Sequence, residues 1–109
     1  MTTITIYKSK EEHYKRFTCN GHAGYANAGK DIVCAAVSCL VINTINSLDE
    51  LTDEPMEITT DEEKGMIDCR FQRTLSEESR LLMDSLILGL KGIIGDYGNK
   101  YLELKFKEV

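Results

Sequence analysis

The sequence has little of what secreted or membrane-spanning proteins need. Four cysteines in 109 residues are too few for a disulfide scaffold, in which cysteine exceeds roughly 8–10% of a short chain. The first residues carry no basic segment followed by an apolar stretch, and no uninterrupted apolar run reaches the roughly 18 residues that cross a bilayer. We therefore expect a cytoplasmic protein with reduced thiols and no membrane partner.

Positive charge is also scarce. Thirteen Lys and Arg stand against eighteen Asp and Glu, and the net charge of -5 disfavours a broad phosphate-binding surface. Basic and aromatic residues are not interleaved as in nucleic-acid-binding domains, and no CxxC pair or HxxxH spacing suits zinc. We expect no nucleic-acid partner, no metal and no cofactor.

Apolar residues, by contrast, are present in ordinary proportion. They make up 42% of the chain, too many for a disordered protein of this modest net charge. Globular domains cluster at roughly 100 to 150 residues. Residues 1–109 are therefore predicted to form a single domain with one core.

The apolar periodicity predicts five strands and two helices. Alternating or β-branched residues indicate strands, and a 3.6-residue repeat indicates helices. In chain order, strands are expected over Thr3–Lys8 and Tyr14–Cys19, a helix over Ile32–Leu51, strands over Met56–Thr60 and 67–72, a helix from Thr74 or Ser76 to Tyr97, and a strand over 102–107. The order ββαββαβ predicts an α+β fold: a two-layer domain with two helices packed on a twisted sheet, mixed or antiparallel. The pattern does not determine the strand order.

Two finer predictions concern the helices. The first is apolar on both sides, which favours a largely buried helix, and Cys39 on it, like Cys19 and Cys69, is expected in the core. In the second, Gly89, Gly92 and Gly95 recur at every third residue, although each costs up to about 1 kcal/mol relative to alanine. This cost predicts close packing of another backbone along the glycines.

The segment from Gly21 to Ser38 carries the candidate chemistry. Asp31 is a preferred N-cap residue, which would place Cys34 at the third helical position, where free N–H groups and the helix dipole favour a thiolate. His22, twelve residues earlier on a glycine-rich loop, is the candidate acid and base. Taken singly, Cys34 also fits a core position and His22 an exposed loop. Asp31 is more often a cap than a catalytic acid, and Ser38 more often packs or bonds to the backbone.

The same residues resemble a known family. The stretches Gly21-His22-Ala23-Gly24-Tyr25-Ala26, Gly29 and Asp31-Ile32-Val33-Cys34-Ala35-Ala36-Val37-Ser38 are similar to the signature of the ribosomal-processing cysteine proteases called Prp. The resemblance implies a cysteine endopeptidase that removes the N-terminal extension of a bacterial large-subunit ribosomal protein, protein twenty-seven, cutting after an aromatic residue. It implies a homodimer, a His22–Cys34 dyad, and supporting roles for Gly21, Asp31 and Ser38.

The mechanism expected from this reading is nucleophilic catalysis. The thiolate of Cys34 attacks the scissile carbonyl, N–H groups at the helix start including that of Cys34 hold the oxyanion, and His22 protonates the leaving amine.

Two alternatives stay open. Besides the protease, the chain could be a non-catalytic ribosome-associated binding module or a thiol redox sensor. For a sensor, Cys39 is a poor resolving partner of Cys34 because it lies on a different helix face.

Overall fold

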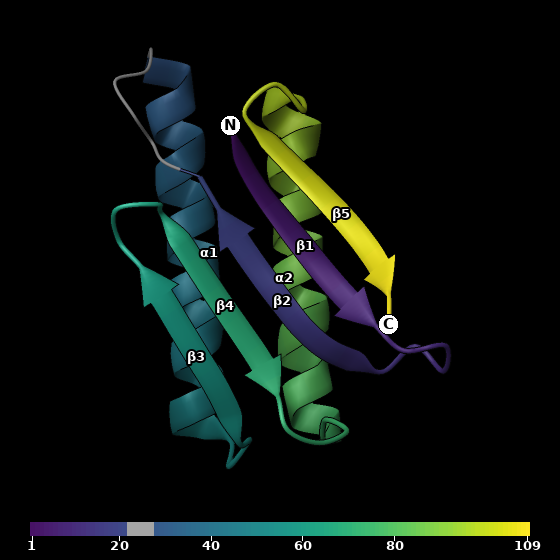
Figure 1. Cartoon of the computed structure of the whole chain (residues 1–109). Helices are drawn as coiled ribbons and strands as arrows, with labels where there is room; N and C mark the ends of the chain where they lie inside the picture. Colours follow the sequence, from purple (N-terminus) through teal and green to yellow (C-terminus); the bar gives the residue numbers. More distant parts are fainter. Residues whose placement is uncertain (22–27) are drawn as a thin grey trace.

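The structure is a computed structural model that describes residues 1–21 and 28–109, with the backbone alone for 28–31. In this part of the chain the elements follow the predicted order ββαββαβ (Figure 1). They are β1 (Thr2–Lys8), β2 (Tyr14–Asn20), α1 (Ala28–Leu51), β3 (Met56–Asp61), β4 (Met66–Phe71), α2 (Glu77–Tyr97) and β5 (Leu102–Glu108). The predicted α+β class is confirmed, and most element ends lie within a residue or two of those expected.

The strands form one mixed sheet in the order β3-β4-β2-β1-β5. The pairs β1–β2, β2–β4 and β3–β4 are antiparallel, whereas β5 runs parallel to β1, with Thr2 opposite Leu102. A parallel neighbour needs a long crossover connection, and α2 supplies it. Both helices therefore lie on the same face of the sheet (Figure 1). β1 lies between β2 and β5, and its first residue, Thr2, is buried.

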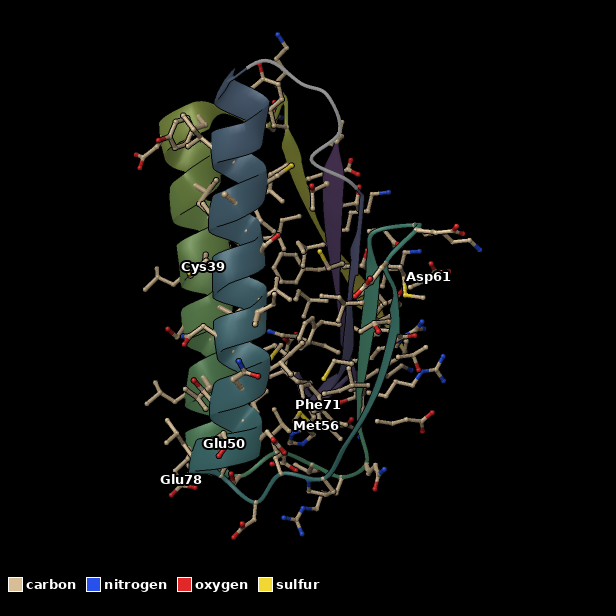
Figure 2. All side chains as sticks on the ribbon, turned by 90° about the vertical axis from the view of Figure 1, so that its left-hand side faces the viewer. Cys39, Glu50, Met56, Asp61, Phe71 and Glu78 are labelled. Carbon is tan, nitrogen blue, oxygen red and sulfur yellow. The ribbon has the colours of Figure 1, made fainter. Side chains whose placement is uncertain are left out.

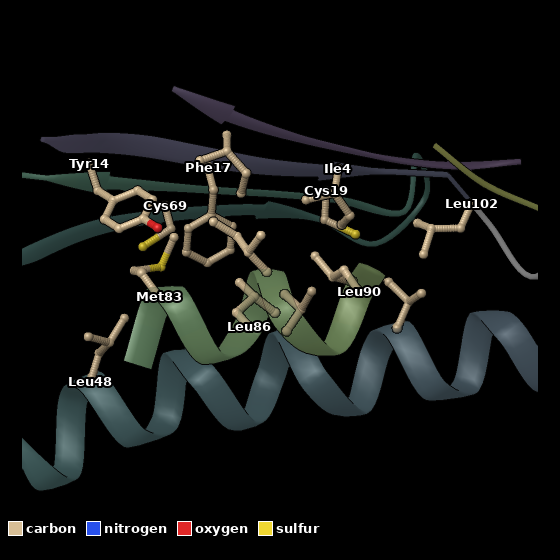
Figure 3. Packing of buried hydrophobic residues seen from close by; sticks show 14 of the residues in the cluster. Ile4, Tyr14, Phe17, Cys19, Leu48, Cys69, Met83, Leu86, Leu90 and Leu102 are labelled. Carbon is tan, nitrogen blue, oxygen red and sulfur yellow. The ribbon is translucent and has the colours of Figure 1, made fainter. Parts of the chain in front are cut away.

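The core lies between the helices and the inward face of the sheet (Figure 3). Alternation along the strands turns Ile4, Ile6 and Phe17 toward the helices, and all three are fully buried. The helices contribute residues at helical spacing on the facing side: Val33, Val37, Val41 and Leu48 from α1, and Met83, Leu86 and Leu90 from α2. This match of two periodicities fixes which side of α1 meets the sheet.

The prediction that α1 is largely buried is wrong. One side is in the core, but Ile32 and Ile42 are each about half exposed, and Cys39 is exposed. Figure 2 shows Met56 and Phe71 between the two layers, and Cys39 on the helix layer. A two-layer fold covers a helix from one side only, so its other side stays open. By length and composition Ile32–Leu51 also suits a membrane-spanning helix, a property it shares with the core helices of soluble proteins.

The glycines of α2 do not pack against a backbone, contrary to expectation. A Cβ on Gly89 would lie 2.9 Å from Leu40 Cδ1, a side-chain atom of α1. A Cβ on Gly92 or Gly95 would meet no described atom within 4 Å. Among the described residues, only the first of the three glycines therefore contacts the other helix.

The ends of α2 follow local signals. Ser76 rather than Thr74 is the N-cap, and its hydroxyl accepts a hydrogen bond of 3.2 Å from the Ser79 N–H. At the other end Gly98 has φ +79° and donates its N–H to the Ile94 carbonyl.

Candidate active site

Cys34 lies inside α1 rather than in its first turn. The helix begins at Ala28, so Asp31 is its fourth residue and Cys34 its seventh. The prediction that Asp31 caps the helix and places Cys34 at the third position is therefore wrong. Cap preference is a weak guide here, because Ala28 and Lys30 are good helix formers, and Gly29 falls in the first turn, where few intrahelical hydrogen bonds depend on it.

This shift changes what the helix does for the sulfur. Beyond the first four residues of an α-helix, each N–H bonds the carbonyl four residues back. The Cys34 N–H therefore belongs to the helix ladder and does not serve as an oxyanion donor, contrary to the expected mechanism. The stabilisation of an anion by the helix dipole also falls off within the first turn. Cys34 needs other groups to hold a thiolate.

One such group is the hydroxyl of Thr2, the first residue of β1. Its Oγ1 lies 3.4 Å from Cys34 Sγ, and both residues are buried, with 4% and 5% of their surface exposed. Thr2 has the same parity along β1 as Ile4 and Ile6, so its side chain points from the sheet toward α1. The sequence motif did not reveal this contact, because 32 residues separate the two partners. The alternation of Ile4 and Ile6 along β1, continued one step back, is the signal that could have placed Thr2 on the inward face.

Gly21 lies against the same end of β1. Its φ is +127°, and its N–H donates to the Gly65 carbonyl at 3.1 Å, which extends the β2–β4 ladder by one residue. A Cβ at this position would lie 2.4 Å from the Met1 carbonyl oxygen and 2.9 Å from the Thr2 Cα. Only glycine fits this backbone conformation and this approach. Gly21 therefore brings the chain that continues into His22 directly against Thr2.

Cys34 opens onto a cavity between α1 and the β3–β4 hairpin. The cavity has a volume of about 620 Å³, and Gly21, Cys34 and Ser38 all contribute to its lining. Its walls are mostly apolar, formed by Ala35, Ile42, Ile45, Ile58, Met66 and Ile67. Asp61 and Glu62 lie at the hairpin turn that borders it. A pocket of this size and lining suits an apolar side chain of a ligand.

The cavity brings together three of the five predicted site residues. Gly21, Cys34 and Ser38 share it. His22 lies outside the described residues, and so does the side chain of Asp31. The roles predicted for these five residues stay predictions.

Two other thiols near the core are held neutral. Burial, and then the charge that Cys34 carries when ionised, raise the pKa of Cys19 to about 11. Burial, and then the Asp68 carboxylate, raise the pKa of Cys69 to about 12. Cys19 lines the cavity too, but at neutral pH it remains a thiol. Within residues 1–21 and 32–109, no group of three or more His, Cys, Asp or Glu side chains could hold a metal ion.

A cysteine on the wall of an apolar cavity is an arrangement that a thiol peptidase can use. Comparison with known proteins gives the family: the family model described as Cysteine protease Prp matches residues 1–102. The chain belongs to this family and is a cysteine protease.

Relatives agree with this assignment over nearly the whole chain. The ribosomal processing cysteine protease Prp of Staphylococcus aureus is 29% identical over 107 residues, covering 98% of this chain and all of the relative. The protein of the same name from Bacillus subtilis is 31% identical over 101 residues, covering 89% of this chain and 90% of the relative.

Solved structures show the same fold. A crystal structure of the S. aureus protease with a substrate peptide has a TM-score of 0.90 at 28% identity, covering 98% of this chain and 100% of that one. Another, with a covalently linked product peptide, has a TM-score of 0.87 at 29% identity over the same shares of the two chains.

Proposed function

We propose that this chain removes the N-terminal extension of the bacterial large-subunit ribosomal protein twenty-seven, cutting after an aromatic residue. The observation that carries the proposal is the placement of Cys34 on the wall of an apolar cavity of about 620 Å³. Its relatives are named ribosomal processing proteases, and the S. aureus protease binds a substrate peptide.

The proposed chemistry is covalent catalysis by a His22–Cys34 dyad. The Cys34 thiolate attacks the scissile carbonyl carbon, and the C–N bond breaks as His22 protonates the leaving amine. Water, deprotonated by His22, then hydrolyses the thioester and regenerates the thiol. The product peptide linked covalently to the S. aureus protease supports an intermediate of this kind. Because the Cys34 N–H belongs to the helix ladder, other donors near Sγ hold the oxyanion.

The cavity is the proposed site for the aromatic side chain that precedes the cut. Ile42 and Ile45 from α1 face Ile58 and Ile67 from the hairpin, so a planar ring enters between two apolar walls. Burying a Phe side chain contributes roughly 1.5–3 kcal/mol. A substrate with an aromatic residue at this position is therefore preferred about tenfold or more over a substrate without one.

Cleavage of the ribosomal precursor tests the proposal. Wild type is expected to cut the extension at one bond, after an aromatic residue, as followed by intact mass. A precursor with that aromatic residue changed to alanine is expected to lose at least about tenfold in kcat/KM, because the buried ring is missing. Uncut precursor, or equal cleavage of both precursors, would contradict the proposal.

Two neighbouring strand residues supply a matched control. Ile58 lines the cavity and is 42% exposed, so Ile58→Glu places a charge on the apolar wall without burying it in the core. Thr59→Glu adds the same charge on the opposite, exposed face of β3. We expect Ile58→Glu to raise KM for the aromatic precursor about tenfold, and Thr59→Glu to leave it near wild type.

We also propose that the protease acts in the cytoplasm as a homodimer joined through α2. Leu81 and Leu88 on this helix are 68% and 74% exposed, and Gly92 and Gly95 continue the same side into open space. Residues at these spacings share one helix face. A second copy turned by a two-fold axis would cover that face with the same residues.

Sedimentation tests the dimer. Leu88→Glu is expected to convert the dimer to monomer, because it places a charge at the centre of the shared face. Leu51→Glu, at an equally exposed leucine at the end of α1, serves as the control and is expected to leave the dimer intact. A dimer that survives Leu88→Glu would place the contact elsewhere, for example at the sheet edge formed by β3 or β5.

A further inference from the structure

We propose that Thr2 is a positioning residue for the nucleophile: its hydroxyl donates a hydrogen bond to the Cys34 thiolate and holds the sulfur in place at the cavity that Gly21 also lines. This inference rests on the proposed role of Cys34 as the nucleophile. It gives the first residue of β1 a part in the reaction of a cysteine protease.

The first support is the contact itself. Thr2 Oγ1 and Cys34 Sγ lie 3.4 Å apart in a buried setting. In the neutral pair either atom can donate, because a thiol and a hydroxyl each carry a proton. Once Cys34 is ionised the sulfur only accepts, so the hydroxyl turns its proton toward it. Hydrogen bonds to an ionised partner are about twice as strong as neutral ones, so the contact favours the thiolate.

The second support is that the backbone of Thr2 is fixed on several sides. Its N–H donates to the Tyr101 carbonyl at 3.0 Å, and it stands opposite Leu102 of β5. On the other side the backbone of Gly21 lies so close to the Thr2 Cα that no Cβ fits between them. A donor held in this way needs no reorganisation when charge develops on the sulfur.

The third support is the setting of Cys34 in α1 and in the cavity. Cys34 lies past the first helical turn, where the dipole is weak. Cys19 from β2 is a neutral thiol at working pH. Asp61 and Glu62 from the hairpin line the same cavity, and their negative charge disfavours a thiolate. The Thr2 hydroxyl, in contrast, is a hydrogen-bond donor 3.4 Å from the sulfur.

Thr2 also joins the two segments of the proposed dyad. It touches Cys34 through its side chain and Gly21 through its backbone, and Gly21 directly precedes His22. The geometry therefore links the position of the sulfur to the position of Gly21. A change at Thr2 alters both contacts.

Thr2→Val tests the inference, because valine keeps the β-branched shape and removes only the hydroxyl. We expect the alkylation of Cys34 by iodoacetamide near neutral pH to slow about tenfold, because the thiolate is the reacting form and loses a hydrogen-bond donor. The alkylation rate is followed at Cys34 by peptide mass over a range of pH. For a model peptide substrate, kcat is expected to fall by a similar factor while KM changes less than about twofold.

Thr2→Ser and Thr5→Val are the controls. Serine keeps the hydroxyl and is expected to restore the wild-type pH profile. Thr5 is also buried on β1 but belongs to the opposite face of the sheet, so Thr5→Val is expected to leave the profile unchanged. If Thr2→Val does not fold, Thr2→Ala compared with Thr2→Ser makes the same test, because these two again differ by the hydroxyl.

Alkylation needs no ribosomal substrate, so its outcome is separate from that of the proposed function. If the wild-type enzyme leaves the precursor uncut, but Cys34 alkylation is slower in Thr2→Val, the proposed substrate would be wrong and the proposed role of Thr2 supported. A folded Thr2→Val protein with the wild-type alkylation profile would overturn the role of Thr2 whatever the substrate.

Discussion

Cys34→Ala is expected to abolish peptide cleavage, lowering kcat by about 10⁴-fold or more, because the variant has no group that forms the thioester. Cys19, also at the cavity, is a poor substitute, because burial keeps it protonated. His22→Ala is expected to lose about 10²–10⁴-fold, the usual contribution of general acid–base catalysis. Single-turnover cleavage of the precursor, followed by mass, measures both losses.

Cys39→Ala is the matched control for the loss of a thiol. Cys39 lies on the same helix five residues later, but it is exposed and does not line the cavity. We expect full activity in this variant. Thermal unfolding of Cys34→Ala must remain close to wild type for the comparison to hold, since the residue is buried. Substantial cleavage by a folded Cys34→Ala protein would remove the nucleophile from the mechanism.

The same pair of variants separates the alternatives left open by the sequence. A redox sensor would retain peptide binding without turnover, and the state of its Cys34 thiol would depend on the oxidant present. A ribosome-associated binding module would tolerate Cys34→Ala altogether. Membership of a protease family and the cavity beside Cys34 favour turnover.

The strands of this fold were predictable because each obeys a local rule. Ile4 and Ile6 alternate with polar neighbours, and so do Ile67 and Cys69, as a half-buried strand requires. The parallel pairing of β5 with β1 was not predictable, because it depends on how α2 crosses the sheet. Periodicity indicates which side of a strand is buried, but it does not indicate which other strand lies next to it in the sheet.

The candidate site, too, could be predicted from the sequence only in part. The motif identified Cys34, and the structure brings Gly21 and Ser38 to the same cavity. The start of α1 was misplaced because the capping preference of Asp31 competes with a helix that begins four residues before the predicted Ile32. Thr2 was missed because it meets Cys34 through a tertiary contact between residues 32 positions apart.

Gly21→Ala is expected to damage both stability and activity. The methyl group would lie 2.4 Å from the Met1 carbonyl oxygen, a backbone atom that cannot swing aside, and φ +127° is itself strained for alanine. Strain of this kind costs about 1–3 kcal/mol before the clash is counted. We therefore expect the free energy of unfolding in urea to fall by about 3 kcal/mol or more.

Two other glycines separate the causes of that loss. Gly98 also has a positive φ, but no described residue lies within 4 Å of its would-be Cβ, so Gly98→Ala measures strain without a clash. In the Leu88→Glu background, which is monomeric on the proposed interface, Gly92→Ala is expected to stabilise the fold by up to about 1 kcal/mol, because no described residue lies within 4 Å of its would-be Cβ. Equal losses in Gly21→Ala and Gly98→Ala would show that the contact with Met1 and Thr2 is unimportant.

The activity of Gly21→Ala decides what this contact is for. Gly21 touches Thr2, and Thr2 touches Cys34, so a displaced Gly21 moves the hydroxyl away from the sulfur as well as the start of the histidine segment. At a temperature where the variant is fully folded, we expect kcat/KM to fall more than about tenfold, and Cys34 alkylation to slow as it does in Thr2→Val. The double variant with Thr2→Val should then slow alkylation little further, because both changes break one chain of contacts. Multiplicative losses of the alkylation rate would mean that glycine and threonine act on the sulfur independently.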